Sequence, residues 1–142
     1  MSTPEAGQST RAVVAWGVVV GLLQAALPLG FWWLEPSVVY ALSLAVIASV
    51  YIGFAVADGR WTVLAVECSV AGAFVVLAAA GVTGSAWLLV IGLAGHGLKD
   101  VWQERTRYVR GTRWWPLFCA VVDLVVGAVI AVEIVSGVRF HD

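Results

Sequence analysis

Five long apolar stretches alternate along the chain with short polar links. The stretches cover residues 12–34, 38–57, 61–82, 86–102 and 114–135, and each contains 17 to 23 residues. About 20 residues of α-helix, which rises 1.5 Å per residue, cross the roughly 30 Å hydrocarbon core of a bilayer. The pattern therefore predicts an all-α integral membrane protein, a five-helix transmembrane bundle that forms a single domain over residues 12–137.

The links between these stretches are short, so consecutive helices are expected to run antiparallel and to pack as neighbours. Residues 1–11 and 138–142 are predicted to be short tails at the two ends of the bundle. Pro28 is predicted to kink the outer third of the first helix, because proline removes a backbone hydrogen bond. The fourth stretch contains His96, Lys99 and Asp100, which leaves open whether residues 86–102 span fully.

The positions of Lys and Arg predict the orientation, since these residues favour the cytoplasmic side of a membrane. With the N-terminus inside, seven of the eight cations are cytoplasmic: Arg11, Arg60, Lys99, Arg105, Arg107, Arg110 and Arg113. We therefore predict a multi-pass protein of the cytoplasmic (inner) membrane, N-in and C-out. Tryptophans near the ends of the stretches agree with this prediction, because indole rings prefer the headgroup region.

Composition excludes two other classes. The chain is 61% hydrophobic and 12% charged, whereas soluble domains are roughly 45–50% apolar and about 25% charged. The net charge of −1 provides no basic face for nucleic acid. Membrane lipids are the expected surroundings.

Small residues indicate where helices approach closely. Gly17 and Gly21 form a GxxxG pattern in the first stretch, and such patterns let membrane helices come into contact. Packing within the chain is one interpretation. A homo-oligomer that associates through Gly17 and Gly21 is the other.

Ionisable residues lie inside the predicted spans, where charge is costly and calls for an explanation. Counted from the inner boundary, Glu67 and His96 lie about 9 Å deep and Asp123 about 13 Å deep. Asp100 shares a helix face with His96, because four residues separate them, and Tyr51 reaches a similar depth. We expect a polar pocket that opens to the cytoplasm.

Each of these residues also has a purely structural interpretation. Glu67 and Asp123 could each pair with a neighbouring group, and His96 could be held by Asp100 on its own helix. Asp58 is typical of a turn at a helix end. Lys99 and the arginines of residues 105–113 are expected to face water and anionic headgroups.

Metal and cofactor chemistry is not predicted. Cys68 and Cys119 do not form a CxxC pair and are interpreted as small apolar fillers. His96 has no second histidine at its depth for haem, and a zinc site lacks its usual ligands. A magnesium ion held by Asp58, Asp100 and Glu67 stays open, although no Asp-rich motif is present.

Motifs in the carboxyl-terminal third of the chain resemble those of two groups of membrane proteins. The pattern His96-xxx-Asp100-x-Trp102, followed by Trp114-Trp115-Pro116-x-Phe118-Cys119-xxx-Asp123, resembles small bacterial multi-spanning membrane proteins of unassigned function. The His and acid four residues apart also resemble those of emopamil-binding-protein-like sterol isomerases, five-helix membrane proteins with a second acid and a Trp in a lipid pocket. Glu67 would match the second acid. This chain is shorter and has Asp where that family has Glu.

These observations lead to three hypotheses. The first is an intramembrane isomerase or cyclase for an isoprenoid- or sterol-like lipid, a lipophilic small-molecule substrate. Its candidate catalytic groups are Glu67, His96, Asp100 and Asp123, and its candidate substrate-binding residues are Tyr51, Trp61, Trp102, Trp114 and Trp115. The second is a small proton-coupled transporter or channel built from the same acids. The third is a non-catalytic membrane scaffold subunit.

Overall fold

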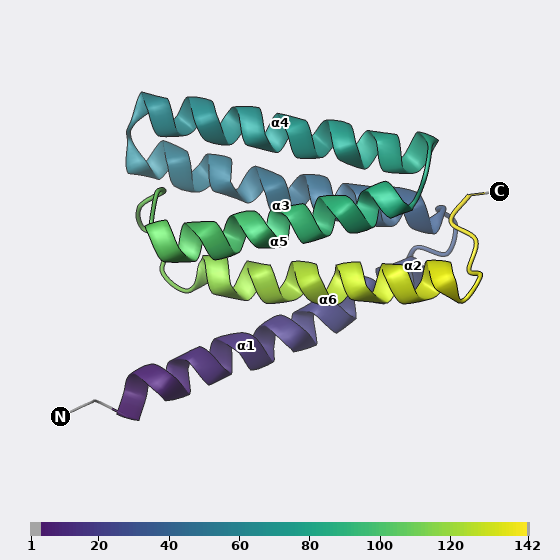
Figure 1. The fold of residues 1–142 in the computed structure, drawn as a ribbon, viewed down its shortest axis with the longest axis horizontal. Helices are drawn as coiled ribbons and strands as arrows, with labels where there is room; N and C mark the ends of the chain where they lie inside the picture. The colour runs from purple at the N-terminus through teal and green to yellow at the C-terminus, as the bar shows by residue number, and fades with distance from the viewer. Residues whose placement is uncertain (1–3, 142) are drawn as a thin grey trace.

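A computed structural model describes residues 4–141, which form six helices joined by short turns and contain no strand. The helices are α1 (Pro4–Ala25), α2 (Leu27–Gly30), α3 (Pro36–Asp58), α4 (Trp61–Thr83), α5 (Trp87–Thr106) and α6 (Trp115–Val135). Figure 1 shows α3 to α6 running alongside one another, with α1 crossing α6 obliquely. The prediction of an all-helical chain is confirmed.

Three of these helices, α3, α4 and α6, are long and apolar enough to cross a membrane. Residues 9–25 of α1 form a shorter apolar helix, and α5 is 20 residues long but carries charged side chains in its second half. Large apolar side chains cover the outside of the bundle: Leu29, Trp32, Trp61 and Val135 are each at least 78% exposed. Such a surface suits lipid better than water.

The first predicted stretch, residues 12–34, does not form one continuous helix. Pro28 has no N–H to donate to the carbonyl of Gln24, and α1 ends at Ala25 before the short helix α2 begins at Leu27. The Ala25 carbonyl accepts a hydrogen bond from the Tyr40 hydroxyl at 2.7 Å. The predicted interruption is therefore present as a break, and a tyrosine of α3 stabilises it. At its other end α1 begins at Pro4, within the stretch predicted as a tail.

The GxxxG pattern packs within the chain. Gly17 and Gly21 face Val121 and Val125 of α6, so closely that a Cβ added to either glycine would lie 2.8–2.9 Å from a valine Cβ. The glycines thus let α1 lie directly on α6. Self-association through the same face would require α1 to leave α6.

Tight turns hold the end of the bundle where α3 meets α4. Gly59 ends α3 with a φ of 81°, a left-handed conformation that glycine adopts without strain. Asp58 pairs with Arg60 at 2.5 Å and accepts a hydrogen bond from the Arg110 backbone N–H at 2.8 Å. The interpretation of Asp58 as a turn residue is confirmed, and its carboxylate also ties this turn to the loop before α6.

Candidate functional site: a buried polar cluster

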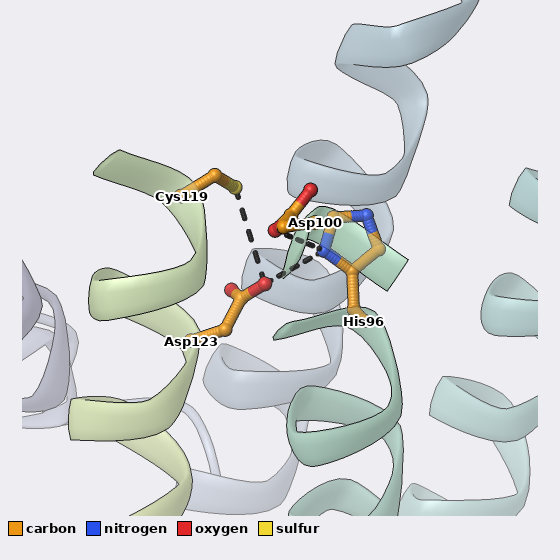
Figure 2. Close-up of side chains that lie close together, drawn as sticks. All are labelled: His96, Asp100, Cys119 and Asp123. Carbon is orange, nitrogen blue, oxygen red and sulfur yellow. Dashed lines mark hydrogen bonds and ion pairs between the residues drawn. The ribbon is translucent and has the colours of Figure 1, made fainter. Parts of the chain in front are cut away.

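Two pairs of polar side chains face each other across the contact between α5 and α6 (Figure 2). His96 and Asp100 are four residues apart on α5, and Cys119 and Asp123 are four residues apart on α6. Residues at this spacing lie one above the other on the same helix face. Because α5 and α6 pack side by side, the two pairs meet in the interior.

His96 lies between two carboxylates. Its Nδ1 atom is 2.6 Å from Asp123 Oδ2 and 3.3 Å from Asp100 Oδ2. The Cys119 Sγ atom is 3.9 Å from the same Asp123 oxygen. The shorter histidine contact is thus with the other helix, and the structural alternative in which Asp100 alone holds His96 does not describe the geometry.

The arrangement extends to two further helices through Tyr51 of α3 and Glu67 of α4, which both contact Lys99 or Asp100 of α5. The Tyr51 hydroxyl donates a hydrogen bond to Asp100 Oδ1 at 2.6 Å. Lys99 Nζ lies 3.4 Å from the centroid of the Tyr51 ring and 2.7 Å from Glu67 Oε2. We call these seven residues the polar cluster; its members are Tyr51, Glu67, His96, Lys99, Asp100, Cys119 and Asp123.

The polar cluster is closed off from the surroundings. Tyr51, Asp100 and Asp123 are fully buried, and Glu67 and His96 are 1% exposed. The His96 ring packs edge-on against Phe74, with ring centroids 5.0 Å apart. Several cluster atoms lack a hydrogen-bond partner among the described residues, including Asp123 Oδ1 and His96 Nε2. Unsatisfied buried carboxylate oxygens are costly and call for an explanation.

The predicted catalytic residues Glu67, His96, Asp100 and Asp123 therefore lie together, but most predicted substrate-binding residues lie elsewhere. Tyr51 belongs to the polar cluster through its hydroxyl. Trp61, Trp102 and Trp114 are 81%, 47% and 54% exposed on the outside. Trp115 is half-buried and packs against Phe54 and Phe118. The tryptophans do not line a common pocket with the acids.

Two grooves of the structure are lined mainly by apolar residues. One, of about 330 Å³, lies between α1, α2 and α3 beside Gln24, Phe31 and Ile47. A second, of about 340 Å³, lies between α1 and the start of α6 beside Trp16, Trp114 and Phe118. Neither groove includes an acid of the polar cluster.

The position of the Lys99 side chain contradicts the prediction made from the sequence. Its side chain does not face water and headgroups but is 12% exposed and points at Glu67. The physical reason is that a buried carboxylate on α4 needs a partner, and α5 brings Lys99 within reach. Glu67 is accordingly paired with an ammonium group rather than with His96.

The interpretation of Cys119 as a small apolar filler misses the contact of its Sγ atom with Asp123. The signal that could have found it is the repeated spacing: Cys119-xxx-Asp123 on one helix matches His96-xxx-Asp100 on the other. Cys68, by contrast, is exposed.

Comparisons with known proteins return nothing: no family model matches the chain, and neither a curated protein nor a solved structure shows significant similarity. The fold and the site together define a helical protein with three helices suited to crossing a membrane and a sealed, charged interior. Chemically, that interior can hold a positive charge between carboxylates.

Proposed function

We propose that this chain is a small cation carrier of the cytoplasmic membrane, which takes up its cation in the polar cluster. The observation that carries the proposal is an imbalance of buried charge. Glu67, Asp100 and Asp123 bring three carboxylates into the interior, whereas Lys99 brings one ammonium group. With all three carboxylates ionised, even a protonated His96 leaves one negative charge in excess.

Such an excess is expensive in a membrane interior. A charged side chain at the centre of a bilayer costs about 3 kcal/mol or more, and buried acids typically mark ion and proton pathways. The Lys99–Glu67 pair compensates itself, so the excess charge belongs to Asp100 and Asp123. A cation bound between these two carboxylates would remove the imbalance.

The carrier is proposed to span the membrane five times, N-in and C-out. Figure 1 supports this topology, because the two termini lie at opposite ends of the helical bundle. The turns at the end where α1 begins carry Arg60, Arg107 and Arg110, as a cytoplasmic side requires. On α5, His96, Asp100 and Gln103 are buried rather than exposed to lipid, which favours α5 as a span.

The intramembrane isomerase or cyclase is a weaker candidate. Its catalytic acids must touch a lipid, yet Asp100 and Asp123 are fully buried, and three of the four predicted substrate-binding tryptophans, Trp61, Trp102 and Trp114, lie on the outside. Organic extraction and mass spectrometry of the purified protein separate the two proposals. A single isoprenoid-like lipid in equal stoichiometry would favour the isomerase, and bulk phospholipid alone would favour the carrier.

Reconstitution into proteoliposomes tests the carrier directly. Cation entry is followed with dyes inside the vesicles that respond to protons or to divalent metal ions, under an imposed ion gradient. We expect flux with the native chain and at least a tenfold loss in Asp100→Asn and Asp123→Asn. Glu104→Gln is the matched control, because Glu104 lies on α5 but pairs with Arg107 at the surface. Absence of flux, or equal flux in all variants, would overturn the proposal.

A further inference from the structure

The four side chains in Figure 2 share a property that the whole polar cluster does not. Each of them offers an atom that can ligate a metal: the His96 Nδ1, the Cys119 Sγ, and an oxygen of Asp100 and of Asp123. All four atoms lie within 4.8 Å of one another, and all four residues are buried.

We propose that His96, Asp100, Cys119 and Asp123 bind one divalent transition-metal ion. The inference rests on the cation carrier proposed above and names its cation. Closely spaced cysteines and histidines, the usual sequence signal for such a site, are absent, and the sequence leaves open only a magnesium ion held by Asp58, Asp100 and Glu67. Here the ligands come instead in two pairs, one on α5 and one on α6.

The distances suit a four-coordinate ion. Metal–ligand bonds of about 2.0–2.3 Å in a tetrahedron place neighbouring ligand atoms roughly 3.3–3.8 Å apart. The separation of His96 Nδ1 and Asp100 Oδ2 is 3.3 Å, and that of Cys119 Sγ and Asp123 Oδ2 is 3.9 Å. The 2.6 Å contact between His96 Nδ1 and Asp123 Oδ2 must open, and ligand atoms that lie up to 4.8 Å apart must move closer, before the four atoms surround one ion.

The orphaned atoms provide a second, independent observation. Asp123 Oδ1 is a buried oxygen without a hydrogen-bond partner among the described residues, and Asp100 Oδ2 has only an ion-pair contact of 3.3 Å with His96 Nδ1, which lies closer to Asp123 Oδ2. An unpaired buried polar atom of this kind costs about 1–3 kcal/mol, and more when it is charged. Coordination to a metal would give these two carboxylates the partner that the protein donors supply only in part.

Charge and ligand type together define the class of ion. Cys119 binds as a thiolate and its proton is released to solvent on metal binding, so two carboxylates and one thiolate surround the two positive charges of the ion. A sulfur and an imidazole nitrogen favour zinc, cobalt or ferrous iron over magnesium and calcium, which prefer oxygen ligands alone.

Tyr51 completes the site as a positioning residue. Its hydroxyl donates to Asp100 Oδ1 at 2.6 Å, which leaves Oδ2 directed at His96. Hydrogen bonds from such outer groups orient metal ligands and raise metal affinity.

Cobalt(II) is the probe for the test, because it can replace zinc and its absorption reports both geometry and sulfur ligation. The full chain is purified in detergent, its affinity tag is removed, and bound metal is stripped with a chelator and quantified. We expect one Co²⁺ per chain, with the strong visible absorption of a tetrahedral site and a charge-transfer band from sulfur. Zinc should displace the cobalt.

Two cysteine variants make the assignment specific. Cys119→Ser should lose the sulfur charge-transfer band and bind at least tenfold more weakly, whereas Cys68→Ser, at an exposed position, should match the native spectrum. Size-exclusion chromatography establishes that each variant remains monodisperse. No stoichiometric Co²⁺, or a sulfur band that survives in Cys119→Ser, would overturn the metal site.

The cobalt-binding and flux experiments together test the metal site and the carrier as two distinct proposals. Proton flux in proteoliposomes without any stoichiometric metal would overturn the metal site and leave the carrier standing. Stoichiometric metal with the expected Cys119 dependence, but no flux of any cation, would support the site as a structural metal centre and overturn the carrier.

Discussion

Lys99 Nζ lies 2.7 Å from Glu67 Oε2, and this ion pair joins α5 to α4 in the interior of the bundle. Neither residue has another charged partner at ion-pair distance among the described residues. Each therefore depends on the other for the compensation of its charge. The pair also positions Lys99 over the ring of Tyr51, which connects it to the ligands on α5.

Removing one partner of this pair should destabilise the fold more than removing both. Lys99→Met leaves Glu67 buried and unpaired, so we expect the free energy of unfolding to fall by about 3–5 kcal/mol. The double variant Lys99→Met/Glu67→Met should recover most of this loss, because no charge remains uncompensated. Reversible unfolding with SDS in mixed micelles measures both. A single variant as stable as the native chain would place the Lys99 ammonium in water.

Tyr51 should affect both stability and metal affinity. Tyr51→Phe removes the donor to Asp100 Oδ1, which we expect to cost about 1–3 kcal/mol in unfolding free energy and about tenfold or more in Co²⁺ affinity. The measurements are SDS unfolding and absorption titration.

Tyr40→Phe is the matched control for that prediction. The Tyr40 hydroxyl also donates to a buried acceptor, the Ala25 carbonyl, but at the break between α1 and α2. Its loss should lower stability without changing Co²⁺ affinity. An equal effect of the two variants on affinity would show that Tyr51 acts only through general stability.

The contact of α1 with α6 should depend on Gly17. A Cβ at this position would lie 2.8 Å from Val121 Cβ and 3.2 Å from the Phe118 carbonyl oxygen, so Gly17→Ala should cost about 1–3 kcal/mol through overpacking. Gly53→Ala is the control, because a Cβ there meets nothing within 4 Å; helix propensity predicts a gain of up to about 1 kcal/mol. Unfolding with SDS measures the stability of both variants. If Gly17→Ala were as stable as the native chain, α1 would not pack on α6.

Reporter fusions test the proposed topology. A periplasmic phosphatase fused after Asp142 should be active and a fluorescent protein fused there should be dark in a bacterial host, because five spans with the N-terminus inside place the C-terminus outside. A fluorescent protein fused at the N-terminus should be bright. If α5 did not cross the membrane, the phosphatase at the C-terminus would be inactive instead.

The amino-acid sequence by itself determined most of the long helices and the spacing of ionisable groups along them. Hydropathy and helix length depend on local residues, so α3, α4 and α6 match their predicted stretches to within two residues at each end. The i, i+4 spacing of His96 and Asp100 likewise put them on one face without any knowledge of the neighbours.

Only the tertiary structure decided which groups meet. Helical periodicity defines a face but not the helix toward which that face turns, so the inward direction of Lys99 and the position of Cys119 beside Asp123 depended on packing. The same reason explains why Gly17 meets α6 of its own chain and why Trp61, Trp102 and Trp114 lie on the outside. Pairing of buried charges is a property of the assembled bundle, because its energy depends on distances between helices that the sequence does not specify.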